Sequence, residues 1–274
     1  MKKSISFGII QGRLTQSPPN CLQWFPEDSW EKEFITAKKL GINYIELIAD
    51  IEYNPKNPIW SKNGRSKIRK LVKDNNLTHH ALCNDFTINH SLLDEKVIKQ
   101  NFDLIKHAKD IGIDKYILPL FLESELNSKN MNEFIEPIRI IAKAAKSNNM
   151  STCLETILSG KEMLKLLSLI NLPFVKVVYD LGNQVALGHD LSDDIRQLAN
   201  NIGHIHIKDK NLNNENILLG TGLVNFEKVF DALKDINYEG PYALETVRGS
   251  DPIKTAIYNM QLVEFFAGNS FSNV

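Results

Sequence analysis

The chain has 274 residues, of which 43% are hydrophobic and 24% are charged, an ordinary globular composition that supports a buried core. Its net charge is −1, with 32 Lys and Arg residues against 33 Asp and Glu residues. This balance excludes the basic surface expected of a nucleic-acid-binding protein. We therefore expect a small-molecule ligand, with neither nucleic acid nor a membrane as a partner.

The cysteines and the first residues of the chain favour a cytoplasmic location. Cys21, Cys83 and Cys153 are odd in number and widely spaced, which does not suit a disulfide framework and fits a reducing compartment. The apolar run at 5–10 is too short for the hydrophobic region of a signal peptide. No stretch approaches the roughly 20 apolar residues that span a bilayer.

Short apolar runs alternate along the chain with longer amphipathic stretches. The first apolar run is followed by a loop rich in proline and then by a helical pattern that begins at Ser29 and stops at Gly41, a residue favoured just after a helix. Consecutive apolar positions, as at 175–178, are typical of parallel strands covered on both faces. Strands are predicted at 4–10, 44–48, 77–83, 115–120, 150–155, 175–180, 204–208 and 242–246, and helices at 29–40, 61–76, 94–111, 130–149, 161–170, 191–201, 226–236 and 252–266.

Eight strands that are each followed by a helix predict an α/β fold, a single (β/α)8 TIM barrel. Parallel strands need crossover helices, and eight such units close a barrel. An open doubly wound sheet is the alternative. It is disfavoured because no G-x-G-x-x-G or G-x-x-x-x-G-K-[ST] motif follows any of the strands. No linker or domain boundary is visible, so we expect residues 1–274 to form one domain.

Four successive strands end in polar residues that can bind a metal ion. In such a barrel the active-site side chains project from the carboxyl ends of the strands. Three carboxylates in one cup repel one another, and they are tolerated only around a cation or a shared proton. One divalent ion (Mn²⁺, Mg²⁺, Co²⁺ or Zn²⁺) satisfies them, and a helix cap, an ion pair or a core histidine is the alternative for each residue alone. The predicted metal ligands are Glu155, Asp180, His206 and Glu245.

The chain resembles the xylose isomerase-like barrel superfamily, which contains ketose 3-epimerases, hydroxypyruvate isomerase, inosose dehydratase and isomerase, and the apurinic endonucleases. The resemblance covers nearly the whole chain. It implies that the same four residues bind the metal and that Glu155 and Glu245 act as an acid/base pair. The segments that carry it are Gly8–Arg13, Leu154–Thr156, Tyr179–Asn183, His204–Asp209, Leu219–Gly222 and Leu244–Thr246.

Residues near the same strand ends are candidates for substrate binding. Lys208 is expected to neutralise an oxyanion or contact a phosphate or carboxylate, with a surface pair to Asp209 as the alternative. Because side chains alternate along a strand, His80 is favoured over its neighbour as the histidine that faces the barrel interior and the substrate. The other candidates are Gln11, Arg13 and Glu46 at the first two strand ends, which can equally form loop salt bridges, and Arg248, which can hold an anion or be solvated.

Asn183 is a further substrate-binding candidate and a departure from the family pattern. Many ketose 3-epimerases and the endonucleases have histidine at this position. The departure counts against a free-ketose 3-epimerase, and it removes one ligand of a multinuclear zinc site.

Two loops offer weaker signals. Backbone N–H groups at 220–222 could bind a phosphate, but a plain turn before the helix cap at Asn225 is preferred. The aromatic residues of the first two loops could form a wall against a sugar, a lid or a dimer contact. These are Trp24, Phe25, Trp30 and Trp60.

We therefore expect a metal-dependent isomerase or epimerase of a sugar or sugar phosphate that acts through an enediolate. One alternative is an apurinic-endonuclease-like metal phosphodiesterase, which would need further histidines and a basic groove. A polyol or keto-sugar dehydratase on the same metal site and a non-catalytic sugar-binding barrel are the others. The proteins that it resembles are commonly dimers or tetramers, and the sequence does not decide between a homodimer and a homotetramer.

Overall fold

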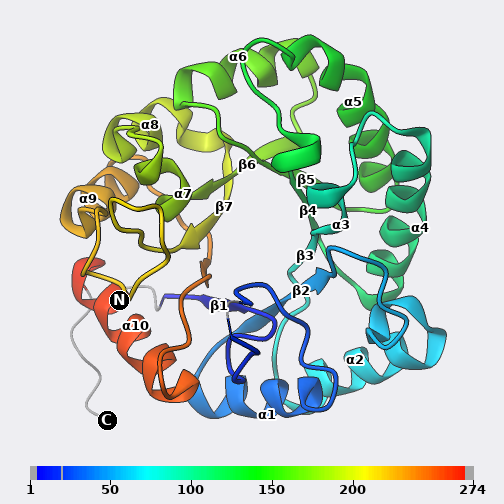
Figure 1. Cartoon of the computed structure of the whole chain (residues 1–274), viewed down its shortest axis with the longest axis vertical. Coiled ribbons are helices and arrows are strands. Elements are labelled where there is room, and N and C mark those ends of the chain that lie inside the picture. Colours follow the sequence, from blue (N-terminus) through cyan, green and yellow to red (C-terminus); the bar gives the residue numbers. More distant parts are fainter. Residues whose placement is uncertain (1–4, 20, 269–274) are drawn as a thin grey trace.

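A computed structural model describes residues 5–19 and 21–268 of the chain. Its eight strands are parallel and hydrogen-bonded in sequence order, and β8 pairs with β1 to close the barrel (Figure 1). The predicted (β/α)8 barrel is therefore confirmed, although the predicted strand start at Ser4 lies outside the described residues. The strands are β1 Phe7–Ile10, β2 Tyr44–Ala49, β3 Ala81–Asn84, β4 Lys115–Pro119, β5 Ser151–Glu155, β6 Val175–Asp180, β7 Ile202–Ile207 and β8 Tyr242–Leu244.

The long helices form a ring around the barrel, as Figure 1 shows. Two short helices that the sequence did not predict lie at the carboxyl rim, α3 (Phe86–Asn89) after β3 and α7 (Leu181–Ala186) after β6. Within the described part of the chain, no helix is long and apolar enough to cross a membrane. The ring consists of α1 Trp30–Leu40, α2 Lys62–Asp74, α4 Glu95–Ile111, α5 Met131–Ser147, α6 Gly160–Ile170, α8 Leu191–Leu198, α9 Phe226–Asp235 and α10 Pro252–Phe266.

The helix ends follow from local sequence signals. Gly41 and Gly112 end α1 and α4 with φ of 77° and 100°, a left-handed conformation that glycine adopts without strain. Ser159 and Glu162 form a reciprocal capping box at the start of α6. Asp180 both ends β6 and caps α7 at the rim of the barrel, because its carboxylate accepts a hydrogen bond from the Asn183 N–H at 2.7 Å.

The third strand differs from its prediction, since it begins at Ala81 and not at residue 77. Its ladder with β2 starts at the pair Leu47–Leu82, and its ladder with β4 starts at Ala81–Lys115. Residues 77–80 therefore lead into the barrel at its amino end, before the sheet begins. The strand also ends one residue later than predicted, at Asn84, so Asp85 directly follows it.

Candidate metal centre

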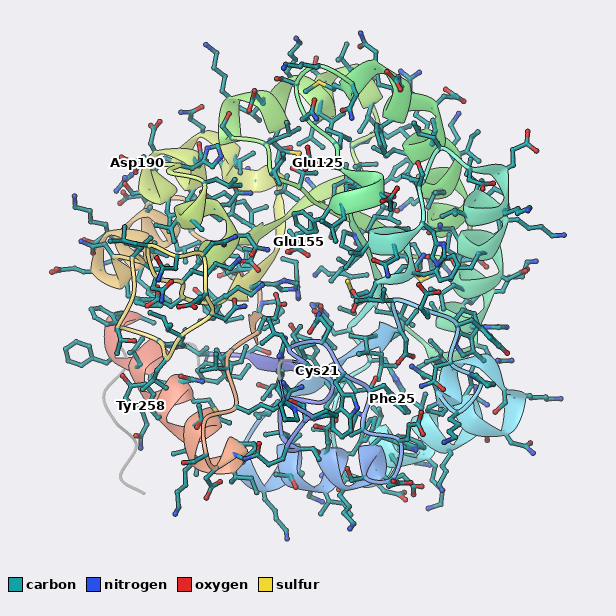
Figure 2. All side chains as sticks on the ribbon, viewed as in Figure 1. Cys21, Phe25, Glu125, Glu155, Asp190 and Tyr258 are labelled. Carbon is teal, nitrogen blue, oxygen red and sulfur yellow. The ribbon has the colours of Figure 1, made fainter. Side chains whose placement is uncertain are left out.

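The structure brings together the four side chains that the strand ends predicted. Glu155 and Asp180 are the last residues of β5 and β6, His206 lies near the end of β7, and Glu245 follows β8. One ligand atom from each lies within 4.8 Å of all the others. All four are buried, and Figure 2 shows Glu155 near the axis of the barrel. Three oxygens and one nitrogen therefore meet at one point of the carboxyl rim.

Glu46 fixes the orientation of His206. Its Oε1 lies 3.1 Å from His206 Nε2, and its Oε2 lies 2.6 Å from His204 Nε2. This pairing turns His206 Nδ1 towards the carboxylates, 3.1 Å from Glu245 Oε2 and 3.8 Å from the nearest oxygens of Glu155 and Asp180. A carboxylate bonded to the far nitrogen of a histidine is the usual support for a metal ligand. Glu46 was expected to contact the substrate; it lines the cavity of the site, and both of its oxygens are bonded to the two histidines.

Charge and burial shift the pKa values of Glu46 and His204. Burial opposes ionisation of Glu46, but His206 and His204 outweigh it and lower the pKa of Glu46 to about 2. Burial lowers the pKa of His204 to about 4, although Glu46 acts in the opposite direction. Glu46 is therefore a carboxylate and His204 is neutral at physiological pH.

The neutral state of His204 predicts a loss of stability in mild acid. In the unfolded chain its pKa returns to about 6.5, so the unfolded state binds a proton that the folded state does not. Between pH 7 and pH 5 this difference is expected to lower the free energy of unfolding by about 2 kcal/mol. Urea denaturation at the two pH values measures it. The variant His204→Gln, which keeps a donor for Glu46, is expected to lose correspondingly less on acidification, and equal losses in both proteins would contradict the assignment.

Lys208 lies inside the cluster and not on the surface. Its Nζ is 2.9 Å from Asp180 Oδ2 and 2.9 Å from Glu245 Oε2, and the residue is only 4% exposed. Burial opposes its charge, but Asp180 and Glu245 outweigh burial and raise the pKa of Lys208. Burial likewise opposes ionisation of Glu245, yet Lys208 and His206 keep the pKa of Glu245 well below its ordinary value. The alternative of a surface pair with Asp209 is therefore wrong.

The donor set fits one divalent ion. His206 Nδ1 and Asp180 Oδ2 are buried and have no aligned hydrogen-bond partner, although charged groups lie near both atoms. A buried imidazole nitrogen that faces three carboxylates suits Mn²⁺, Mg²⁺, Co²⁺ or Zn²⁺. The three free cysteines are not members of the cluster.

Asn183, Arg13 and Gln11 lie close to the cluster and support it. Asn183 Nδ2 donates to Glu155 Oε1 at 3.2 Å. Arg13 hydrogen-bonds the Leu22 carbonyl and also lies 3.6 Å from Glu245 Oε1. The buried Gln11 side chain accepts from the N–H of Ile48 at 3.3 Å. Of the three, Asn183 lines the cavity above the cluster, whereas the other two side chains hold the ends of β1 and β2 in place.

His80 and Arg248 do not lie where a substrate contact requires. His80 does turn to the barrel interior, but it precedes β3 at the amino end, with Nδ1 3.3 Å from Asp114 Oδ1. The guanidinium of Arg248 is buried and donates to the backbone carbonyls of Gly12 at 2.7 Å and Cys21 at 3.2 Å. Arg248 is thus neither solvated nor placed to hold an anion, and it fixes the loop after β1.

The loop at 220–222 uses its N–H groups internally. Asp209 Oδ2 accepts from the N–H of Gly220 at 3.0 Å and of Gly222 at 2.9 Å, and its Oδ1 accepts from Val224 at 3.1 Å. This carboxylate occupies the donors that a phosphate would need. The preferred interpretation of a plain turn agrees with these contacts.

Sequence reasoning missed Asp85, which directly follows β3. Its side chain is 1% exposed and lies 3.2 Å from Cys83 Sγ and 3.5 Å from Gln23 Nε2. It lines a cavity of about 150 Å³ together with Glu155 and Glu245. A signal is present in the sequence, because Asp85 is a strand-end carboxylate, but the predicted strand ends at Cys83 and the observed strand ends at Asn84.

The fold and the site define a TIM barrel with a carboxylate–histidine cluster at its carboxyl rim. Residues 34–264 match the model of the xylose isomerase-like TIM barrel family, and the chain belongs to that family. The L-ribulose-5-phosphate 3-epimerase UlaE of Escherichia coli is 23% identical over 262 residues, which cover 89% of this chain and 88% of that protein.

Two solved structures share the fold. The structure of an L-ribulose 3-epimerase has a TM-score of 0.76 at 16% identity, and the match covers 97% of this chain and 95% of the other. A D-psicose 3-epimerase with D-tagatose from Clostridium cellulolyticum has a TM-score of 0.75 at 16% identity, with 96% and 99% covered. At these identities the likeness shows the barrel fold.

Proposed function

We propose that the protein is a divalent-metal-dependent isomerase or epimerase of a sugar, acting through an enediolate. The observation that carries this proposal is the meeting of Glu155, Asp180, His206 and Glu245 at one buried point beneath a cavity. The relatives described above, whose names give ketose or ketose-phosphate 3-epimerase activities, support the same chemistry.

The four residues would hold one ion, and two of them have a second task. When bound, the ion polarises the substrate carbonyl and stabilises the negative charge of the enediolate. Glu155 and Glu245 both line the cavity, so each can reach a carbon next to that carbonyl. One removes a proton, and the other returns a proton to the opposite face, which inverts the carbon. Return to the adjacent carbon gives aldose–ketose isomerisation instead.

The surrounding residues prepare the two glutamates for these roles. Asn183 holds one oxygen of Glu155 and leaves the other oxygen free to accept a proton. Glu245 lies among Lys208, His206 and Arg13, which keep it ionised. Lys208 is also placed to neutralise charge that develops on the substrate oxygens.

A metal phosphodiesterase is disfavoured by the same geometry. The second histidine–carboxylate group, Glu46 with His204 and His206, shares His206 with the first, and Glu46 is bonded to both histidines, so the group does not offer an independent second metal site. Asn183 is engaged with Glu155 and Asp180, and it is not a metal ligand of the usual type.

The ion and the location are finer proposals. We propose Mn²⁺ as the first ion to test, because oxygen-rich sites with one imidazole accept it readily. A cytoplasmic location agrees with Cys21, Cys83 and Cys153, all of which are free thiols.

The proposed function predicts metal-dependent exchange of a carbon-bound hydrogen with solvent. The protein is stripped with a chelator, reloaded with Mn²⁺ and incubated in D₂O with a panel of ketoses and aldoses. We expect deuterium on carbon in at least one sugar, only with the metal, and close to one ion per chain by elemental analysis. Loss of water from the product would indicate a dehydratase. A protein that neither retains nor responds to any divalent ion would refute the proposal.

A further inference from the structure

A second cavity extends the site outwards. It has a volume of about 330 Å³ and lies between the loops that follow β1 and β2. Gln23 and Asp85 line both this cavity and the smaller one that contains Glu155 and Glu245, so the two cavities are adjacent. In Figure 2, Phe25 marks the outer cavity on the side of α1 and α2, while Glu155 lies near the centre of the ring. A sugar whose carbonyl end lies at the cluster would place its other end here.

The outer cavity is acidic. Four carboxylates line it (Glu27, Asp50, Glu52 and Asp85), and none of its described lining residues is a lysine, arginine or histidine. Glu27 and Glu52 are near the surface and pair with cationic side chains there. Within the described ranges, the hydrogen-bond partners of Asp50 and Asp85, further in, are amides and a thiol, such as the Asn57 Nδ2 at 2.7 Å from Asp50. Asp85 also interacts electrostatically with the buried Arg13.

The same cavity offers surfaces that suit a sugar. Three aromatic residues, Trp24, Phe25 and Tyr53, are among those that line it, and aromatic rings suit the C–H faces of a carbohydrate. Carboxylate oxygens accept hydrogen bonds from hydroxyl groups, and neighbouring amide N–H groups donate to hydroxyl oxygens. Burial raises the pKa of Asp85 to about 8, so its carboxyl group can also act as a donor near neutral pH.

Among the described residues, the cationic and N–H groups near the site that could bind a phosphate are held by other contacts, apart from the buried Nε of Arg13 and Nη2 of Arg248. The N–H groups of Gly220 and Gly222 bind Asp209, and Arg248 binds backbone carbonyls. Lys208 is held between two carboxylates, and Lys210 donates to Asn214 at 2.8 Å.

We propose that Asp85 and Asp50 are specificity-determining residues that bind the hydroxyl groups of an uncharged sugar and exclude its phosphate ester. This inference rests on the proposed function and names its substrate class. Asn183 does not line the outer cavity, so its departure from the histidine of many ketose 3-epimerases does not bear on this part of the substrate.

The test compares L-ribulose with L-ribulose 5-phosphate on the Mn²⁺-loaded protein. Intrinsic tryptophan fluorescence reports binding, since Trp24 lines the cavity, and deuterium incorporation from D₂O is measured in the same samples. We expect the free ketose to bind about 100-fold more tightly, because Asp50 repels the phosphate and neither Asp50 nor Asp85 offers it a cationic partner. Asp50→Asn/Asp85→Asn is expected to reduce this ratio at least tenfold.

Two variants keep the test clear. Asp50→Asn alone alters a half-buried residue and serves if the double variant does not fold. Glu123→Gln removes a charge from an exposed position that lines neither cavity, and it should leave the ratio unchanged. Equal or tighter binding of the phosphate ester, or binding of neither sugar, would overturn the inference. Tight binding of L-ribulose by a protein that exchanges hydrogen in none of the sugars of the panel would refute the proposed function and leave the preference for the uncharged sugar standing.

Discussion

Replacement of Lys208 by methionine is expected to lower the free energy of unfolding of the metal-free protein by about 3–5 kcal/mol, the usual cost of removing one partner of a buried ion pair. Lys208 Nζ lies 2.9 Å from both Asp180 and Glu245, so its loss leaves two buried carboxylates without their nearest cation. A divalent ion at the cluster supplies that charge instead. Mn²⁺ should therefore restore most of the lost stability and stabilise the variant more than it stabilises the wild type.

Urea denaturation with a chelator and with Mn²⁺ measures both effects. Lys254→Met is the matched control, because Lys254 Nζ is 3.5 Å from Asp251 but its side chain is 84% exposed. An exposed pair contributes about 0–1 kcal/mol, and its loss should not respond to the metal. A Lys208→Met protein that is as stable as the wild type without metal would show that the carboxylates do not repel one another. A destabilised variant that Mn²⁺ fails to rescue would show that the cluster does not bind the ion.

The barrel and the metal cluster could be predicted because both depend on short-range rules. Apolar runs with helices between them determine a parallel barrel, and the carboxyl ends of its strands share one rim. A residue such as Asp180 needs only its position at a strand end to be placed correctly. The predicted meeting of four such ends in space required no knowledge of any loop.

The positions of the substrate-binding candidates were harder to predict. Alternation along a strand gives the face on which a side chain lies, but not its position along the barrel axis. His80 faces the interior as predicted. It lies at the amino end of the barrel, because β3 begins only at the residue that follows it, Ala81. Arg248 follows a strand end, but its Nε and Nη1 donate to backbone carbonyls of the loop after β1. Glu46 points inwards and is bonded to histidines from β7, across the barrel interior. Contacts between distant segments decided these positions, and the sequence does not encode them locally.

Replacement of either glutamate of the proposed acid/base pair is expected to lower kcat for epimerisation by about 100- to 10,000-fold, the range of a single positioned acid or base. The two variants should differ in other respects. Asn183 can still donate to a glutamine at position 155, so Glu155→Gln should keep the local structure. Glu245 lies within 3.6 Å of Arg13, His206 and Lys208, so Glu245→Gln leaves three cationic groups short of a counter-charge and should weaken metal binding more.

Deuterium exchange in D₂O with each of the two epimers separates the roles of the two residues. Because the two bases act on opposite faces, each variant should still exchange the hydrogen of one epimer, and the two variants should retain exchange for different epimers. Metal content measured by elemental analysis distinguishes the loss of a base from the loss of the ion. Glu227→Gln changes an exposed residue in the first turn of α9 and should leave the kinetics unchanged. If both variants exchange the same epimer, a single base serves both faces, and the assignment of a pair on opposite sides of the sugar is wrong.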